Sequence, residues 1–137
     1  MYQIIYISTA RPGTTEKDIT DILGVSRRNN HRHSVTGLLV SDGTRFLQAL
    51  EGDEAAVNAA YVRIKTDPRH RAPVILSTRT VSERQFGAWQ MAFSGFGAMP
   101  ADHTLAELVD QLVARVNDPN TRALFAGFAR IRRHNAA

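Results

Sequence analysis

The 137-residue chain contains no cysteine. This absence excludes disulfide scaffolds, thiolate zinc sites, cysteine nucleophiles and covalent thiol adducts to a cofactor. Lysine is almost as rare: Lys17 and Lys65 are the only two among 17 basic residues, so arginine carries most of the basic charge and the net charge is +4. Arginine suits phosphate, carboxylate and stacked partners. A nucleic acid, a phosphorylated cofactor, an acidic partner or simply a solvated basic surface all remain compatible with this composition.

Long apolar runs are also missing. No stretch approaches the roughly 20 residues that a membrane helix needs. The N-terminus enters a strand-like pattern at once and lacks the charged region and apolar stretch of a signal peptide. We therefore expect a soluble, cytoplasmic protein without membrane contact, and its length predicts one domain with a real hydrophobic core.

Catalytic and metal-binding signatures are missing too. The five histidines show no spacing with carboxylates that is typical of a zinc site. The sequence contains no Gly-x-Ser-x-Gly pattern, no P-loop and no Gly-x-Gly-x-x-Gly. We expect neither a metal site nor an enzyme.

What the chain does contain is an alternation of strand-like and helix-like segments. Runs rich in β-branched and aromatic residues predict strands over residues 2–8, 35–40, 45–50, 73–81 and 88–93. Helical stripes lie between the first two strands and between the third and fourth. The order β-α-β-β-α-β-β predicts an α+β, ferredoxin-like fold with an added fifth strand, in which two helices cover one face of a mixed sheet.

A linker over residues 95–101 is followed by two further helices. Thr104 with Glu107 forms a capping box, and Asp118 followed by Pro119 begins the last helix. We expect this pair to pack on the other face of the sheet, which would otherwise expose apolar side chains. Residues 1–95 would then be the binding domain, and residues 96–137 an extension of the same domain.

Several polar or amphipathic side chains occupy positions expected to face inward. The apolar stripe of the first helix continues into Ser26 and Asn30, and strand alternation places Gln48 between Phe46 and Leu50. Each such residue alone is explained as ordinary core or edge structure. Together they predict a gap between helices and sheet where a planar heterocycle with donor and acceptor edges could bind. The set is Tyr6, Ser26, Asn30, Gln48 and Trp89.

An ordered series of motifs over about two-thirds of the chain resembles the BLUF domain, a family of blue-light sensors using flavin. The matching pieces are Ile5-Tyr6-Ile7-Ser8, Ser26-Arg27-Arg28-Asn29-Asn30, Val35-Thr36-Gly37-Leu38-Leu39, Phe46-Leu47-Gln48-Ala49-Leu50-Glu51-Gly52, Val57 through Tyr61 with Arg63 and Ile64, Asp67-Pro68-Arg69-His70, and Arg84-Gln85-Phe86-Gly87-Ala88-Trp89-Gln90-Met91. No single piece is specific, but their order and spacing hold together.

The resemblance implies a noncovalent flavin, usually FAD, with FMN and riboflavin left open, lying between the two helices. It implies that Tyr6 donates an electron and a proton to excited flavin and that Gln48 is a switchable amide between the two. The flavin would be bound on its polar edge, ring edge or phosphate side by Ser26, Asn29, Asn30, Arg69 and His70. Trp89 and Met91 on the fifth strand would relay the new orientation of the amide.

The resemblance also implies how the signal leaves the domain. The chain is expected to be a short, stand-alone BLUF protein that acts on an unidentified downstream protein, and self-association is expected as well. Two alternatives remain: a ferredoxin-like nucleic-acid-binding domain, suggested by the arginine excess, and a small acylphosphatase-like enzyme. Residues 45–48 lack the Gly-aromatic pattern of an RNA-recognition strand, and residues 8–13 make a poor anion-binding loop.

Overall fold

The structure is a computed structural model that describes residues 1–42, 44–86, 92–95, 104–114 and 116–136, with backbone alone at residues 70, 92–95, 105 and 131–136. The described strands are β1 (Tyr2–Ala10), β2 (Thr36–Ser41), β3 (Arg45–Gly52), β4 (His70–Thr80) and β5 (Ala92–Gly95). The described helices are α1 (Glu16–His33), α2 (Glu54–Thr66), α3 (Leu105–Val113) and α4 (Pro119–Ala136).

The five strands form one mixed sheet in the order β4-β1-β3-β2-β5. Strand β3 lies between β1 and β2 and runs antiparallel to both, β4 runs antiparallel to β1, and β5 runs parallel to β2. This arrangement confirms the expected ferredoxin-like order with an added fifth strand.

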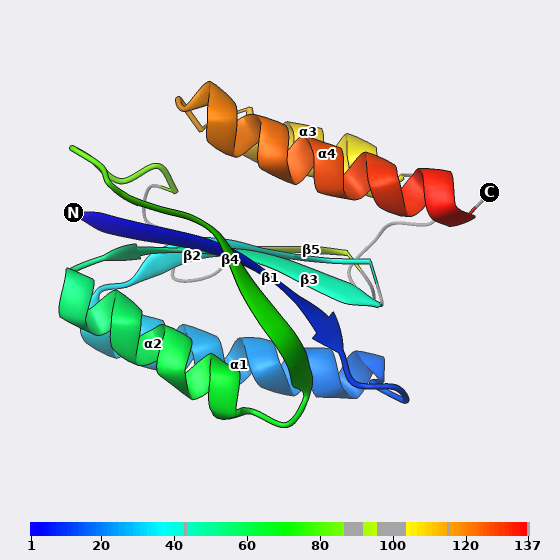
Figure 1. The fold of residues 1–137 in the computed structure, drawn as a ribbon, viewed down its shortest axis with the longest axis horizontal. Helices are drawn as coiled ribbons and strands as arrows, with labels where there is room; N and C mark the ends of the chain where they lie inside the picture. Colours follow the sequence, from blue (N-terminus) through cyan, green and yellow to red (C-terminus); the bar gives the residue numbers. More distant parts are fainter. Residues whose placement is uncertain (43, 87–91, 96–103, 115, 137) are drawn as a thin grey trace.

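Helices cover both faces of the sheet. Helices α1 and α2 lie on one face, and α3 and α4 lie together on the other (Figure 1). Each face has its own apolar core, because successive strand residues point to opposite sides. Phe46 and Leu50 pack with α1 and α2, whereas Leu47 and Ala49 of the same strand pack with α3 and α4. The predicted alternation in the third strand is therefore confirmed.

Local capping explains where the helices begin and end. The Thr15 side chain accepts a hydrogen bond from the Asp18 backbone N–H, and the Asp18 carboxylate accepts one from the Thr15 N–H, so the two residues form a capping box at the start of α1. Helix α1 ends at His33, because the next residue, the C-cap Ser34, has a left-handed φ of 56° that does not continue the helix. At α4, the Asp118 carboxylate accepts from the Thr121 N–H at 2.8 Å, as the Asp-Pro start predicts.

Two strand boundaries differ from the expectation. Strand β4 begins at His70 rather than Pro73, because its pairing with β1 extends to Ala10 opposite His70. Strand β4 lies at the edge of the sheet, where a proline removes no ladder hydrogen bond on the open side. The fifth strand is described over Ala92–Gly95. Most of its expected range, including Trp89 and Met91, lies outside the described residues.

Candidate functional site

A pocket opens on the α1/α2 face of the sheet, where residues far apart in the sequence meet. Five of the predicted site residues line it: Ser26, Asn29, Asn30, Gln48 and Arg69. Its other lining residues are Ile22, Val25, Leu50, Ala60, Arg63, Ile64 and Asp67. The lining therefore combines apolar walls with amide groups and cationic side chains.

The Tyr6–Gln48 pair lies at the inner end of this arrangement. The two residues are direct neighbours in the antiparallel ladder between β1 and β3, so their side chains point to the same face. The Tyr6 hydroxyl donates a hydrogen bond to Gln48 Oε1. Tyr6 is completely buried and Gln48 is 2% exposed. Gln48 lines the pocket while Tyr6 lies behind it, so the amide stands between the phenol and whatever the pocket binds.

The surroundings of Tyr6 keep its phenol protonated. Its ring packs edge-on against Tyr61, with the ring centroids 5.2 Å apart. Burial raises the pKa of Tyr6 well above its ordinary value, and the nearby Tyr61 and Asp67 raise it further. A neutral phenol can donate a hydrogen bond and can later give up its proton, whereas a phenolate could do neither.

Helix α1 supplies the amides on the opposite wall. Ser26 and Asn30 lie one turn apart and share the face that carries the apolar stripe. Asn30 is 3% exposed, and Ser26 and Asn29 are half-buried. The Asn30 carbonyl accepts from the Val35 N–H at 2.9 Å, which ties this end of the helix to the start of β2. The polar continuation of the stripe therefore faces the pocket, as the sequence pattern predicted.

Arg69 lies at the pocket, where the turn from α2 enters β4. Its guanidinium forms a two-point contact with the Asp67 carboxylate, at 3.0 Å from Nε and 2.8 Å from Nη2. The hydrogen bonds and charge of Asp67 raise the pKa of Arg69. The side chain remains 30% exposed, so it can meet an anionic group. His70 begins β4 and pairs with Ala10 through the backbone, but its side chain is not described.

Sequence reasoning did not propose two polar lining residues, Arg63 and Asp67. Arg63 follows Ala60 by three residues, so helical spacing on α2 could have placed it beside the pocket. The motif Asp67-Pro68-Arg69-His70 contains Asp67 but gives it no role in the site. The charge of Asp67 also raises the pKa of Tyr6, and its carboxylate holds the Arg69 guanidinium in place.

The residues present suit a flavin. Amide groups at Asn29, Asn30 and Gln48 offer donors and acceptors for a polar ring edge. The aliphatic lining suits a flat apolar ring system. Among the described residues, no group of three or more His, Asp or Glu side chains could hold a metal ion. In the same part of the chain, every helix is too short or too polar to cross a membrane.

Comparison with known proteins identifies the family. The family described as "BLUF: Sensors of blue-light using FAD" matches residues 1–92. The chain belongs to the BLUF family. The match contains every residue of the predicted site and relay.

Individual BLUF proteins agree with this assignment. The chain is 32% identical over 108 residues to the blue light- and temperature-regulated antirepressor BluF of Escherichia coli, covering 79% of this chain and 27% of that protein. The dark-state structure of the BLUF protein BlrB superposes with a TM-score of 0.66 at 30% identity, over 69% of this chain and 71% of BlrB. BlrP1 of Klebsiella pneumoniae, solved with FMN and cyclic diGMP, gives a TM-score of 0.77 at 25% identity, over 93% of this chain and 34% of BlrP1.

The two alternative functions lose their basis. A nucleic-acid-binding ferredoxin-like domain needs accessible aromatic side chains on its sheet face. In this chain the face opposite the pocket is packed under α3 and α4, where Phe125 is completely buried. Both the BLUF assignment and this packing argue against RNA recognition by the sheet, and the family is one of sensors rather than of acylphosphatases.

Proposed function

We propose that this chain is a blue-light photoreceptor that binds a flavin noncovalently in the pocket between α1, α2 and β3. The Tyr6–Gln48 hydrogen bond beside that pocket is the observation that carries the proposal. It joins a protonated phenol to an amide whose other side faces the pocket.

A bound flavin would supply light absorption and would accept an electron when excited. Tyr6 then gives up an electron and the proton of its hydroxyl group, and Gln48 is the group through which that proton can pass. The amide has a donor end and an acceptor end, so its rotation or tautomerisation reverses the hydrogen bonds without leaving a net charge in the core. The electron and the proton would then return to Tyr6 while Gln48 keeps its new orientation. A bound flavin would be chemically unchanged but would meet different hydrogen bonds from Gln48, so its absorption would shift to the red.

The remaining site residues have separate roles in this proposal. Asn30 holds the polar edge of the ring, with Ser26 beside it on the same helix, and Asn29 lies nearer the ring edge or the phosphate side. Arg69 meets the phosphate side of the cofactor, because a guanidinium forms strong, charge-assisted hydrogen bonds with phosphate. His70 follows directly in the chain and is assigned to the same side. FAD is the cofactor that the family description names, and a relative is solved with FMN.

The output is proposed to reach a partner protein. Trp89 and Met91 would register the amide's orientation and pass it along the fifth strand towards α3 and α4. The E. coli relative is an antirepressor, and by analogy this chain would act on a downstream protein. Self-association of the chain is part of the proposal as well. Residues 1–95 would form the sensing unit, and residues 96–137 its extension.

Absorption spectroscopy of the purified protein loaded with FAD or FMN tests the proposal. Blue light should shift the flavin bands to the red, and darkness should reverse the shift. Tyr6→Phe should abolish the shift while flavin stays bound. Tyr2→Phe is the matched control, since it makes the same change at the first residue of the same strand, four residues before Tyr6. A normal shift in Tyr6→Phe, or a protein that binds no flavin, would contradict the proposal.

A further inference from the structure

A second buried polar site lies on β3, three residues beyond Gln48. Glu51 is completely buried, and the odd spacing from Gln48 places it on the opposite face of the sheet. Its ladder partner on β1 is Gln3, as Tyr6 is the partner of Gln48. The photochemical pair and this pair thus belong to one ladder, about 10 Å apart along the strands.

The Glu51 carboxylate accepts hydrogen bonds from the backbone just before the segment that carries the expected relay residues, Trp89 and Met91. Oε2 accepts from the Gln85 N–H at 2.9 Å, and Oε1 accepts from the Phe86 N–H at 2.8 Å. The Thr36 hydroxyl donates to Oε1 at 2.9 Å. Phe86 is buried and packs edge-on against Phe125 of α4, with centroids 6.3 Å apart. The carboxylate therefore fixes a backbone segment that belongs to the α4 interface.

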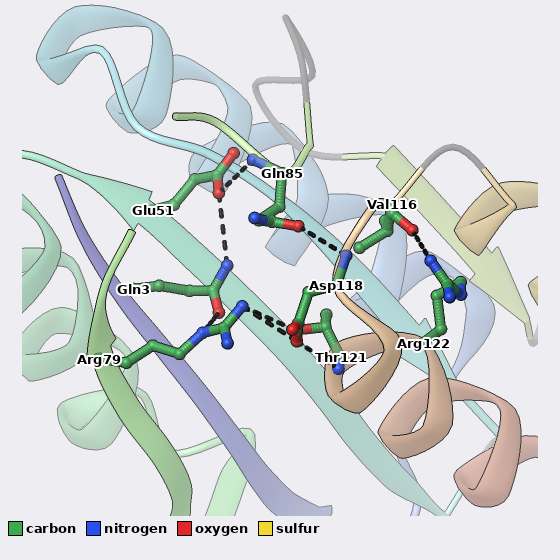
Figure 2. A network of polar contacts seen from close by, with 8 residues as sticks. All are labelled: Gln3, Glu51, Arg79, Gln85, Val116, Asp118, Thr121 and Arg122. Carbon is green, nitrogen blue, oxygen red and sulfur yellow. Dashed lines mark hydrogen bonds and ion pairs between the residues drawn. The ribbon is translucent and has the colours of Figure 1, made fainter. Parts of the chain in front are cut away.

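Hydrogen bonds and an ion pair close a ring that starts and ends at Glu51 (Figure 2). Gln3 Nε2 donates to Glu51 Oε2 at 3.4 Å, and Arg79 Nε donates to Gln3 Oε1 at 3.2 Å. Arg79 Nη2 pairs with Asp118 Oδ2 at 3.0 Å. The Asp118 N–H donates to Gln85 Oε1 at 3.2 Å, and the Gln85 N–H returns to Glu51. The ring joins β1, β3 and β4 to the N-cap of α4.

A buried carboxylate at this point is costly unless each of its hydrogen bonds is made. Arg84 helps to hold Thr36, one of the hydrogen-bond donors to this carboxylate. Its guanidinium donates to Thr36 Oγ1 at 2.7 Å and to the Ser34 carbonyl at 2.7 Å. A shift of β1 against β3 would change the Gln3–Glu51 geometry and, through the ring, the position of Asp118. A closed polar network of this kind can carry coupling, because a change in one hydrogen bond alters the geometry of the next.

We propose that Glu51 is a positioning residue that couples the Tyr6–Gln48 pair to the C-terminal helices, through the backbone at residues 85–86 and the N-cap of α4. This inference rests on the proposed photoreceptor function. It adds a route that is separate from Trp89 and Met91, since it leaves the sheet at β1, β3 and β4 and reaches α4 directly.

Hydrogen exchange measured by mass spectrometry on the flavin-loaded full chain, in the dark and under blue light, tests the coupling. In the wild type, light should change exchange in residues 116–129 together with the red shift. Glu51→Gln should keep the red shift and lose the light-dependent change in exchange. The two backbone N–H groups bond to different carboxylate oxygens, and an amide replaces one of these oxygens with an NH2 donor. Glu54→Gln, an exposed residue in the first turn of α2, is the matched control and should keep both responses.

Arg79→Met provides a second break in the ring. The Asp118 carboxylate that it leaves behind is 16% exposed and keeps its hydrogen bonds from Thr121. Arg79→Met should lose the light-dependent change in exchange while the red shift persists. If Glu51→Gln does not fold, Arg79→Met alone tests the coupling. A wild-type exchange change that survives in either folded variant overturns the coupling. So does a wild type that shows the red shift but no exchange change in α4. Absence of the red shift in the wild type would instead refute the proposed function.

Discussion

Replacing Phe125 with alanine tests whether the C-terminal helices are part of the same cooperative unit as the sensing sheet. Phe125 of α4 is completely buried in the core between α3, α4 and the sheet, and its ring packs against Phe86. Deleting a fully buried phenylalanine ring typically lowers the free energy of unfolding by about 3–5 kcal/mol. For a domain of this size that loss corresponds to a fall in Tm of roughly 10–20 °C.

The assay is urea denaturation of Phe125→Ala, followed both by far-UV circular dichroism and by release of bound flavin. If the helices belong to the domain, both probes should shift to lower urea together. Val62→Ala is the control, because Val62 is 52% exposed on α2 and alanine favours a helix. Two results would refute the view that the helices and the sheet unfold as one unit. One is a fall in the free energy of unfolding of less than about 1 kcal/mol. The other is an early loss of helix by circular dichroism while flavin release is unchanged.

Four further predictions concern the site and the N-cap of α4. Gln48→Leu removes the acceptor of the Tyr6 hydroxyl. It should abolish the light-induced red shift and lower the free energy of unfolding by about 1–2 kcal/mol, measured by difference spectroscopy and denaturation. Arg69→Met should weaken FAD and FMN roughly tenfold or more but leave riboflavin nearly unchanged; equal losses for all three in titrations would contradict a phosphate role. Burial raises the pKa of the Tyr6 phenol, so the folded state holds this proton more tightly than the unfolded state. The free energy of unfolding should therefore decline as the pH rises above about 10, with a smaller decline in Tyr6→Phe. Burial acts to raise the pKa of Asp118, but hydrogen bonds from Thr121 and Arg79 outweigh it and the pKa is lowered. Its stabilising contribution is present above about pH 4 and is lost as the pH falls. Asp118→Ala should cost about 1 kcal/mol at neutral pH and show less acid sensitivity in pH-dependent melts.

Much of the fold follows from the sequence, because local signals agree with the tertiary arrangement. The alternation through Phe46, Gln48 and Leu50 assigns one face of β3 correctly. The Thr15–Asp18 box and the Asp118 N-cap mark helix starts with side-chain chemistry that needs no tertiary context. Where proline suggested a boundary, at β4, pairing with the long strand β1 extended the strand instead.

The candidate site was harder to predict from the residues alone. Spacing indicates that Ser26, Asn30 and Gln48 face a gap between the helices and the sheet, but not which further side chains line that gap. The role of Asp67 depends on its contact with Arg69 and on its proximity to Tyr6, both of which exist only in the folded chain. The ring of contacts at Glu51 joins residues that are far apart in the sequence. Arg79 and Gln3, which share one of its hydrogen bonds, are 76 positions apart. No local pattern encodes such contacts.

The most direct test of the account is a light-minus-dark absorption spectrum of the purified, flavin-loaded protein, with Tyr6→Phe measured beside it. The account predicts a reversible red shift of the flavin bands in the wild type and no shift in Tyr6→Phe, although both proteins bind flavin. A wild type whose bound flavin does not respond to blue light, or a variant with a normal shift, would contradict the assignment of Tyr6 and Gln48 as the photochemical pair.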